Sequence, residues 1–395
     1  MSRYKSGLNL LEQHQYVGRP LGRWELDGLY PSVSVIVLNY REPEMTSECL
    51  RSIISLRYAG KIDIIVLDNG SGDGSFERLR VEAGKSPLPV RVLATDQNLG
   101  FTGGVLTAWP HATGELICLL NNDATFHPDC LARLVDGFRR RADLGAVWPF
   151  DAPHTWSEGL QVPDPAKVAL MRNGTHSVVG GNIWLPLMSD YKECFTPSGV
   201  CLLLQRSTDV PFPGEYFAYY EDVYFGWRLR LRGLKAERVL EAIIYHEGSR
   251  TGRLDLGLRQ ALGFHAEKNR LANLILFYAG STLLRILPLL LLDEAKKLVM
   301  VIASITPGRG GAAKLARHIQ ARLWLLRHAA WIRSRRKQVQ AERRVTDHEI
   351  LQLMSGRLTM LENTGGRFVN FLSLSYCRLA RLQTVEFRRT AAARE

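Results

Sequence analysis

The chain has 395 residues, of which 46% are apolar, and its formal net charge is +12. This length suits one large domain with an appended part, and this apolar content excludes wholesale disorder. The six cysteines are scattered and form no C-x-x-C pair, which argues against a disulfide scaffold, a zinc finger and a thioredoxin motif, and fits a reducing cytoplasm.

The first half of the chain alternates apolar strand patterns with helical patterns. After a polar extension without a secretory signal, we expect strands over 33–38, 62–67, 90–94 and 116–120, and helices over 45–56, 75–83, 104–109 and 128–142. This alternation predicts an α/β fold whose largely parallel sheet is covered on both faces. Ligands bind at the carboxyl ends of such strands, where this chain places Tyr40, Asp68, Asp96 and Asp123.

The second half is less regular and then becomes helical. We expect loops from Trp148 to about residue 195, then a strand over 200–204, a helix over 221–232, and a strand over 236–244. From His265 onward the sequence is helical, first apolar and then basic. The predicted organisation is an extension at 1–30, an α/β domain at 31–262, a helical region at 263–345 and a C-terminal tail at 346–395.

The positive charge is concentrated in one segment. Residues 1–308 balance 33 basic against 33 acidic residues, whereas residues 309–344 carry 11 basic residues and one acid. The preceding apolar stretch, 271–292, contains Arg285 and Pro288, which disfavour a simple membrane span. Apolar helices followed by a basic helix favour attachment to an anionic membrane surface, without a nucleic-acid partner. Soluble helical packing and nucleic-acid binding are the alternatives.

Two common nucleotide-binding motifs are absent. No Rossmann fingerprint follows the first strand, and Gly84-Lys85-Ser86 lacks the P-loop glycine, since Leu79 stands five positions before Gly84. The sequence therefore disfavours a dinucleotide dehydrogenase and a Walker-type NTPase.

Carboxylates at two strand ends are candidates for ligand binding. Asp68 could accept a hydrogen bond from a pyrimidine imide or a ribose hydroxyl, or it could form a turn with Asn69-Gly70. Asp123 follows a wholly apolar strand, with the amide of Asn121 two residues before it. It suits a hard divalent cation that bridges a diphosphate, or the cap of the next helix.

Acids and a histidine further along are candidates for catalysis. Glu221 and Asp222 open a helix, where they could complement the helix dipole or provide a general base. His246 ends a strand and is an ordinary packed residue unless it faces Asp123, where an imidazole could ligate a divalent metal.

Several motifs come in a characteristic order: 33–40, 66–71, 98–104, 119–123 and 221–223, followed by His246. Together they resemble the family 2 inverting glycosyltransferases with the GT-A fold, and are most similar to the bacterial rhamnosyltransferase-like branch that builds surface polysaccharides. The resemblance covers residues 31–255, and Asn269-Arg270 and the basic helices resemble the tail of that branch. It implies a GT-A type nucleotide-sugar-binding sheet with flanking helices, plus a C-terminal helical membrane-associated region.

The resemblance also implies a role for individual residues. Asp222 would be the catalytic base, and Asp123 with His246 would bind the metal, Mg²⁺ or Mn²⁺, while Asn121 replaces the first aspartate of the D-x-D motif. The acceptor side would comprise Ser198, Gly199 and Glu221. Donor binding would fall to Asn39, Tyr40, Asp68, Asn98, Gly100, Asn121 and Asn122.

Two departures from the branch concern the sugar and acceptor region. Tyr224 stands where an aspartate often follows the base, and Val105 and Leu106 stand where an asparagine often follows the paired glycines. These positions leave the identity of the donor sugar open.

The implied activity is an inverting, metal-dependent hexosyl transfer. The donor would be dTDP-rhamnose or a UDP-sugar, and the acceptor a hydroxyl of a lipid-linked glycan at the cytoplasmic face of the inner membrane. The alternatives are a catalytically inactive glycan-binding homologue and a nucleotidyltransferase on a similar sheet.

Overall fold

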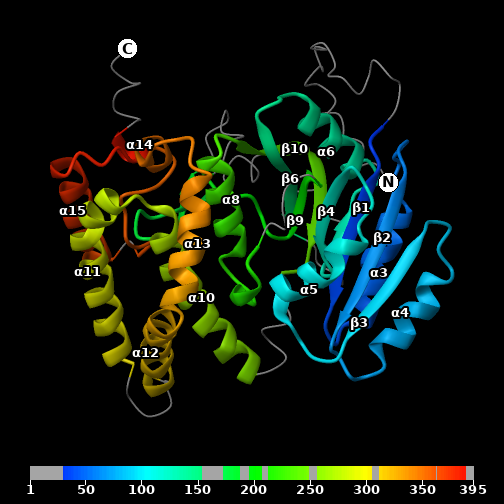
Figure 1. The fold of residues 1–395 in the computed structure, drawn as a ribbon, viewed down its shortest axis with the longest axis horizontal. Helices are drawn as coiled ribbons and strands as arrows, with labels where there is room; N and C mark the ends of the chain where they lie inside the picture. Colours follow the sequence, from blue (N-terminus) through cyan, green and yellow to red (C-terminus); the bar gives the residue numbers. More distant parts are fainter. Residues whose placement is uncertain are drawn as a thin grey trace.

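The computed structural model describes residues 30–153, 172–186, 195–206, 212–248, 256–304, 311–361 and 363–387. An eight-stranded sheet lies on one side of the molecule and a group of C-terminal helices on the other (Figure 1). Its strands are β1 (Val33–Asn39), β2 (Ile62–Asn69), β3 (Val90–Thr95), β4 (Leu116–Asn121), β5 (Ala124–Phe126), β6 (Leu144–Pro153), β9 (Cys201–Gln205) and β10 (Lys235–His246), in the order β3-β2-β1-β4-β9-β6-β10-β5. A separate hairpin pairs β7 (Arg172–His176) with β8 (Asn182–Pro186).

The strands β1 to β4 form one parallel part of the sheet, as predicted, and β6 and β10 form a second parallel pair. Val37 pairs with both Val66 and Leu120, so the polar ends of the three strands lie side by side. The central strand β9 runs antiparallel to both of its neighbours, β4 and β6. The parallel register of β1 with β2 and β4 brings the residues that follow these three strands to one edge of the sheet.

Helices cover both faces of the sheet, which confirms the predicted α/β architecture. The helices are α3 (Pro43–Ile54), α4 (Ser75–Ala83), α5 (Gly100–Ala108), α6 (Cys130–Arg139) and α8 (Glu221–Leu231). Val35 and Val37 of β1 point into a core shared with α3, α4 and α6, whereas Ile36 points into a core shared with α5 and α8. This alternation follows from the two-residue period of a strand.

The prediction of loops from Trp148 to about residue 195 is wrong at β6 and at the hairpin of β7 and β8. Trp148 lies inside β6, which pairs with β9 on one side and β10 on the other. Its sequence, with Gly145, Pro149 and Pro153, carries no strand pattern, and these sheet contacts from distant segments hold it extended. The strand β5 was also missed.

Among the described residues, six further helices follow the sheet. They are α10 (Leu256–Phe277), α11 (Gly280–Ile302), α12 (Gly311–Arg327), α13 (Ala329–Ala341), α14 (Asp347–Leu351) and α15 (Thr364–Leu379), and the last two lie where we expected only a tail. They join α8 through an apolar core in which Trp227 stacks on Phe277 with ring centroids 5.2 Å apart. In the part of the chain that the structure describes, each helix is too short or too polar to cross a membrane.

Part of the basic segment 309–344 stabilises the end of α10. The side chains of Arg336, Gln340 and Arg343 donate hydrogen bonds to the carbonyls of residues 275–278, which have no partner within the helix. Arg322 bonds Glu267 and Glu294. These charges therefore have partners inside the protein, and the attachment of the segment to an anionic membrane surface stays a prediction.

Replacing Arg336 with alanine should destabilise the fold. The substitution removes the donor to the carbonyls of Ile275 and Tyr278, and we expect a loss of about 1–3 kcal/mol in the free energy of unfolding. The exposed Arg333, three residues away on the same helix, is the matched control, and its replacement should cost less than about 0.5 kcal/mol. Urea denaturation of both variants measures the difference, and equal midpoints would contradict this role of Arg336.

Candidate active site

A cavity of about 820 Å³ opens at the carboxyl ends of β1, β2 and β4 and extends to α8 and α10. Its lining combines residues of the sheet with two loops, 196–200 and 217–220. All but one of the predicted site residues line it: Asn39, Tyr40, Asn98, Gly100, Asn121, Asn122, Asp123, Ser198, Gly199, Glu221, Asp222 and His246. The fold therefore brings together motifs that are spread over more than half of the chain.

Asp68 is the exception. Its side chain is buried behind the cavity, where its Oδ1 accepts hydrogen bonds from the Ser71 hydroxyl and, at 2.7 Å, from Asn39 Nδ2. These two hydrogen bonds hold Asn39 and Ser71 in place. Ser71 Oγ also accepts a hydrogen bond from the backbone N–H of Arg41. Asp68 is not among the residues that line the cavity, and it orients Asn39, which is one of them. The direct contact of Asp68 with a ligand stays a prediction.

An amide network shapes the side of the cavity formed by β2 and α5. Asn69 Nδ2 donates to the carbonyl of Gly100, and Asn69 Oδ1 accepts from the backbone N–H of Leu99. Gly100 has a φ of +70°, and a Cβ there would lie 2.5 Å from Phe217. Only glycine fits this position, because both the backbone conformation and the close approach exclude a side chain. Asn69 was considered only as a turn residue.

Asp123 and His246 meet in the cavity. Nε2 of His246 lies 3.4 Å from Asp123 Oδ2, and its Nδ1 lies 3.1 Å from Asp151 Oδ2. Burial alone would lower the pKa of His246, but the two carboxylates outweigh it and raise that pKa to about 10. Asp151, which also lines the cavity, was missed because it lies in β6.

The donor set at Asp123 fits a divalent metal. Asp123 Oδ1 is buried and has no hydrogen-bond partner among the described residues, which is a costly arrangement for a carboxylate oxygen. The carboxylate oxygen suits a hard divalent cation such as Mg²⁺ or Mn²⁺, and the imidazole beside it is a common ligand for borderline divalent metals. Asp123 and His246 are therefore the residues that would hold the ion, with Asp151 orienting the imidazole from behind.

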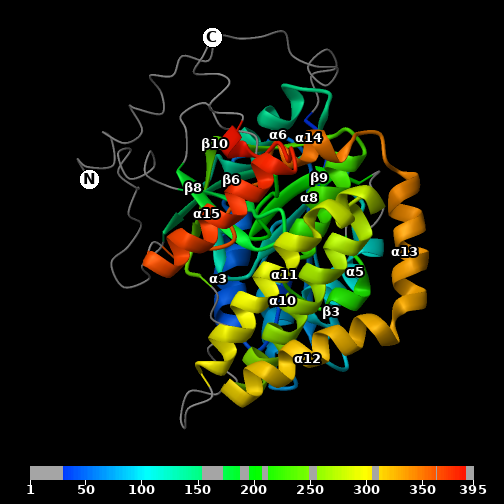
Figure 2. The same ribbon diagram turned by 90° about the vertical axis from the view of Figure 1, so that its left-hand side faces the viewer.

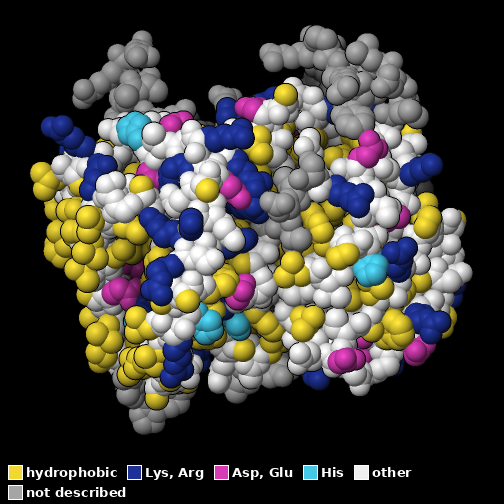
Figure 3. Space-filling model, in the orientation of Figure 1, with side chains coloured by type: hydrophobic (Ala, Val, Ile, Leu, Met, Phe, Trp, Pro, Cys, Tyr) yellow, Lys and Arg dark blue, Asp and Glu magenta, His cyan; other side chains and the backbone are white. Residues whose placement is uncertain are grey.

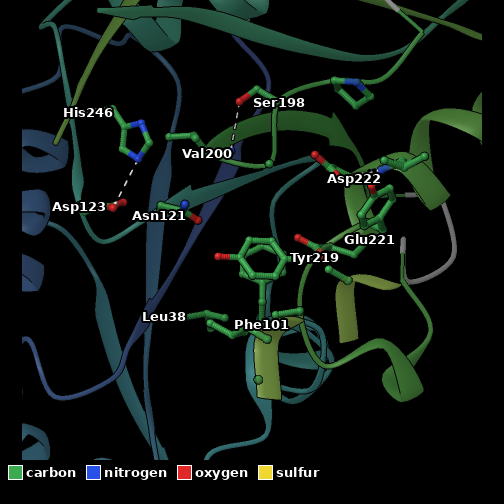
Figure 4. A pocket seen from close by; sticks show the side chains of 18 of the residues that line it. Leu38, Phe101, Asn121, Asp123, Ser198, Val200, Tyr219, Glu221, Asp222 and His246 are labelled. Carbon is green, nitrogen blue, oxygen red and sulfur yellow. Dashed lines mark hydrogen bonds and ion pairs between the residues drawn. The ribbon is translucent and has the colours of Figure 1, made fainter. Parts of the chain in front are cut away.

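Glu221 and Asp222 lie on the opposite side of the cavity (Figure 4). Burial raises the pKa of both carboxyl groups, and the charge of Asp222 raises that of Glu221 further. Glu221 Oε2 has no hydrogen-bond partner among the described residues. Gly199 lies against the pair, and a Cβ there would be 3.9 Å from both Asp222 Oδ2 and Glu221 Oε1, which is an ordinary contact distance. A carboxylate with a raised pKa suits a general base.

The loop before α8 has a strained backbone. Phe217, Tyr219 and Tyr220 all have positive φ values, between 64° and 67°, which non-glycine residues rarely adopt. This conformation places the side chain of Tyr219 in the cavity between Asp123 and the two acids (Figure 4). Such strain persists only where surrounding contacts impose it.

Helix α10 supplies those contacts. The side chain of Asn269 donates to the carbonyls of Tyr216, Ala218 and Tyr219, and Asn273 Nδ2 donates to the carbonyl of Tyr220. Both asparagines are almost fully buried. We therefore identify them as positioning residues for Glu221 and Asp222. The signal in the sequence was a set of polar residues inside an apolar helix, and only Asn269 had been noted.

Removing the Asn269 side chain should lower the activity of the candidate site. Asn269→Ala deletes three hydrogen bonds to the strained loop, so we expect kcat to fall at least about tenfold while the chain stays folded. Asn370→Ala is the matched control, because Asn370 also binds a loop by three hydrogen bonds, at residues 358–359, and does not line the cavity. Equal losses of kcat in the two variants would reduce Asn269 to a stabilising role.

A second acidic group lies within the helices. Glu267, Glu294 and His318 approach one another closely enough to share a cation. However, Arg270 and Arg322 contact both carboxylates. The positive charge that a metal would supply is already present, so this group is an ion-pair network and the metal assignment remains with Asp123.

A family model and several known proteins are similar in sequence to the part of the chain that forms much of the cavity. Residues 34–179 match the family model described as glycosyl transferase family 2. The N-acetylglucosaminyl-diphospho-decaprenol L-rhamnosyltransferase of Mycobacterium tuberculosis is 28% identical over 248 residues, which cover 55% of this chain and 77% of that protein. An N-acetylglucosaminyltransferase of Bradyrhizobium sp. is 30% identical over 105 residues, or 26% of this chain and 69% of that protein.

The fold is also similar to that of solved structures. S. aureus TarS 1-349 in complex with UDP-GlcNAc has a TM-score of 0.49 and 15% identity, covering 88% of this chain and 90% of that one. The match to the family model includes Asp123 and ends before Asp222 and His246, which the structure adds to the same cavity. The matched motifs and the relatives together show that the chain belongs to glycosyl transferase family 2.

Proposed function

We propose that the chain is a metal-dependent, inverting hexosyltransferase. Its donor would be a nucleoside-diphosphate sugar, dTDP-rhamnose or a UDP-sugar, and its acceptor a hydroxyl of a lipid-linked glycan in bacterial surface polysaccharide synthesis. The observation that carries the proposal is one cavity with a candidate metal ligand, Asp123, on one side and a candidate base, Asp222, on the other. The names of two relatives, a rhamnosyltransferase and an N-acetylglucosaminyltransferase, support this substrate class.

On the base side, Asp222 would accept the proton of the acceptor hydroxyl. The oxygen would then attack the anomeric carbon from the face opposite the leaving nucleoside diphosphate, which inverts the configuration in one displacement. Glu221, whose pKa is raised by burial and by Asp222, can remain protonated and donate a hydrogen bond to the acceptor. Asn269 and Asn273 fix the position of both acids by hydrogen bonds to the carbonyls of the loop that precedes them.

On the donor side, Asn39 and Tyr40 would contact the nucleotide, with Asp68 orienting Asn39. Asp123 and His246 would hold a divalent cation. When bound, this cation would neutralise negative charge on the diphosphate. The amide network of Asn69, Asn98 and Gly100 sets the shape of the pocket beside it.

A panel of nucleotide sugars tests this proposal. Thermal denaturation with Mn²⁺ and each nucleotide sugar should identify the donor, because a ligand at 100 times its dissociation constant adds about 2.7 kcal/mol of stability. Release of the nucleoside diphosphate with an extracted lipid-linked acceptor then reports transfer. Binding without release would favour an inactive glycan-binding homologue, and release of pyrophosphate would favour a nucleotidyltransferase.

The proposed place of action is the cytoplasmic face of the inner membrane, as a peripheral or monotopic protein. A lipid-linked acceptor requires the cavity to work close to a bilayer. The distribution of exposed apolar side chains indicates which surface would make that contact.

A further inference from the structure

From residue 287 onward, helix α11 carries its charges on its inner face and apolar side chains on its outer face. Between residues 287 and 303 every exposed residue is apolar: Leu287, Pro288, Leu291, Ala295, Leu298, Val299, Met300, Ile302 and Ala303. The four charged residues of this stretch are turned toward the protein: Asp293, Glu294, Lys296 and Lys297. A helix at the surface of a protein in water shows the reverse pattern.

The inward charges have partners. Arg270, which is 2% exposed, lies 3.5 Å from Asp293 and 2.9 Å from Glu294, and Lys297 lies 3.3 Å from Glu267. Rotating α11 to expose these groups would take Asp293 and Glu294 away from the buried Arg270, which would keep Glu267 of its own helix, and would separate Lys297 from Glu267. The apolar side of α11 is therefore held outward by the ion-pair network behind it.

Helix α15 extends the same apolar surface. Its Phe368, Phe371 and Leu379 are between 60% and 81% exposed, and the hydroxyl of Tyr376 donates to the carbonyl of Arg285 on α11 at 2.7 Å. The two helices lie on the face that Figure 2 turns toward the viewer, and apolar side chains gather over them at the left edge of Figure 3. We call the exposed side chains of residues 284–303 and 367–379 the α11/α15 face.

The charge of this face is of one sign. Its exposed charged residues are Arg285, Arg367 and Arg378, and the sequence of α15 contains no acid. Arginines beside exposed leucines and phenylalanines complement anionic lipid headgroups over an acyl layer. A second copy of the same face would bring arginines against arginines, which disfavours self-association as the reason for the exposure.

We propose that the α11/α15 face docks the protein onto an anionic membrane surface, with its apolar side chains at the boundary between headgroups and acyl chains. The inference rests on the proposed function only for its purpose, which is to keep the cavity near a lipid-linked acceptor. The proposed membrane contact lies on α11 and α15. The sequence alone had pointed to the basic segment 309–344 as the part attracted to anionic lipid.

Sedimentation with vesicles tests the apolar part. We expect the full chain to bind vesicles of phosphatidylethanolamine and phosphatidylglycerol, and to bind pure phosphatidylcholine vesicles more weakly. Replacing Leu284, Leu291, Val299 and Phe371 with glutamine should weaken binding at least about 100-fold, because each would leave the acyl boundary. These side chains are at least 62% exposed, so the chain should remain folded. Val81→Gln, at an equally exposed valine of α4, is the matched control and should bind as the wild type does.

A second pair of variants tests the charge. Replacing both Arg367 and Arg378 with glutamine should weaken binding to the anionic vesicles about fivefold per residue, and should leave the weaker binding to phosphatidylcholine unchanged. Lys61→Gln, at an exposed position beside β2, is the control for loss of a positive charge.

Equal vesicle binding by the wild type and the glutamine variant would overturn the proposal. So would a wild-type dimer that ignores vesicles and that the glutamine variant converts to a monomer, because the face would then bind a second copy. Asp222→Asn should still bind vesicles fully. Vesicle binding without sugar transfer would count against the proposed function alone, whereas transfer to a water-soluble acceptor by a wild type that ignores vesicles would count against the docking face alone.

Discussion

Replacing Asp222 with asparagine is expected to abolish sugar transfer while leaving donor binding unchanged. The amide has the same shape but cannot accept the proton of the acceptor hydroxyl, and we expect kcat to fall at least about 100-fold. Asp222 lies across the cavity from Asp123, so the donor side keeps its ligands. Single-turnover transfer together with calorimetric titration of the donor separates the two effects. Transfer within threefold of the wild type would remove Asp222 from this role.

The pH profile provides an independent check of the same role. A base must be ionised to act, and burial raises the pKa of Asp222 above that of an ordinary aspartate, which is about 3.9. The rate should therefore rise with pH through a pKa above that value. This rising limb should disappear from the residual activity of Asp222→Asn.

Glu221→Gln is the matched control on the neighbouring acid. The amide keeps a donor for the acceptor, so kcat should fall less than about tenfold. The effect of this substitution on the free energy of unfolding should depend on pH. A carboxyl whose folded pKa is raised binds its proton more tightly in the native state, so its contribution to stability is lost as pH rises through that pKa. Above this range the glutamine variant should be more stable than the wild type.

Replacing Asp123 with alanine is expected to remove metal-dependent donor binding. Asp123 Oδ1 is a buried oxygen without a hydrogen-bond partner among the described residues, and its loss should weaken Mn²⁺ binding at least about 100-fold. Titration of Mn²⁺ and of the donor nucleotide into the full chain measures this without reference to activity. His246→Ala should have a milder effect.

Asp96→Ala is the matched control, because Asp96 also follows a strand of the parallel part of the sheet but is exposed and does not line the cavity.

Metal binding should in addition strengthen as pH rises, since the pKa of His246 is raised to about 10 and a ligand imidazole must lose its proton. If a chelator and both the Asp123 and His246 substitutions leave activity unchanged, the metal assignment is wrong.

The parallel part of the fold and most of the candidate site could be predicted because their signals are local. Each of β1, β2 and β4 is a short apolar run with a polar residue at its end, and parallel strands bring such ends to one edge whatever the details of packing. Tyr40 and Asp123 were found in this way, whereas Asn39 was assigned by the family resemblance. The acids at the start of α8 were found because a helix start is itself a local pattern.

The remaining features depended on contacts between distant segments. Asp151 and His246 are 95 residues apart and meet only because β6 and β10 pair, and Asn269 reaches a loop about 50 residues before it. The direction in which Asp68 points was set by Asn39 and Ser71 rather than by its place at a strand end.

The exposure of α11 shows the same division between sequence and tertiary structure. Its apolar and charged residues were visible in the sequence, and an apolar stripe is ordinarily assigned to the core. Only the tertiary structure showed that the charges face inward, because their partners Glu267 and Arg270 lie on α10. The sequence alone determined the composition of that helix. Its outward apolar face was decided by the cost of burying a charge without a partner.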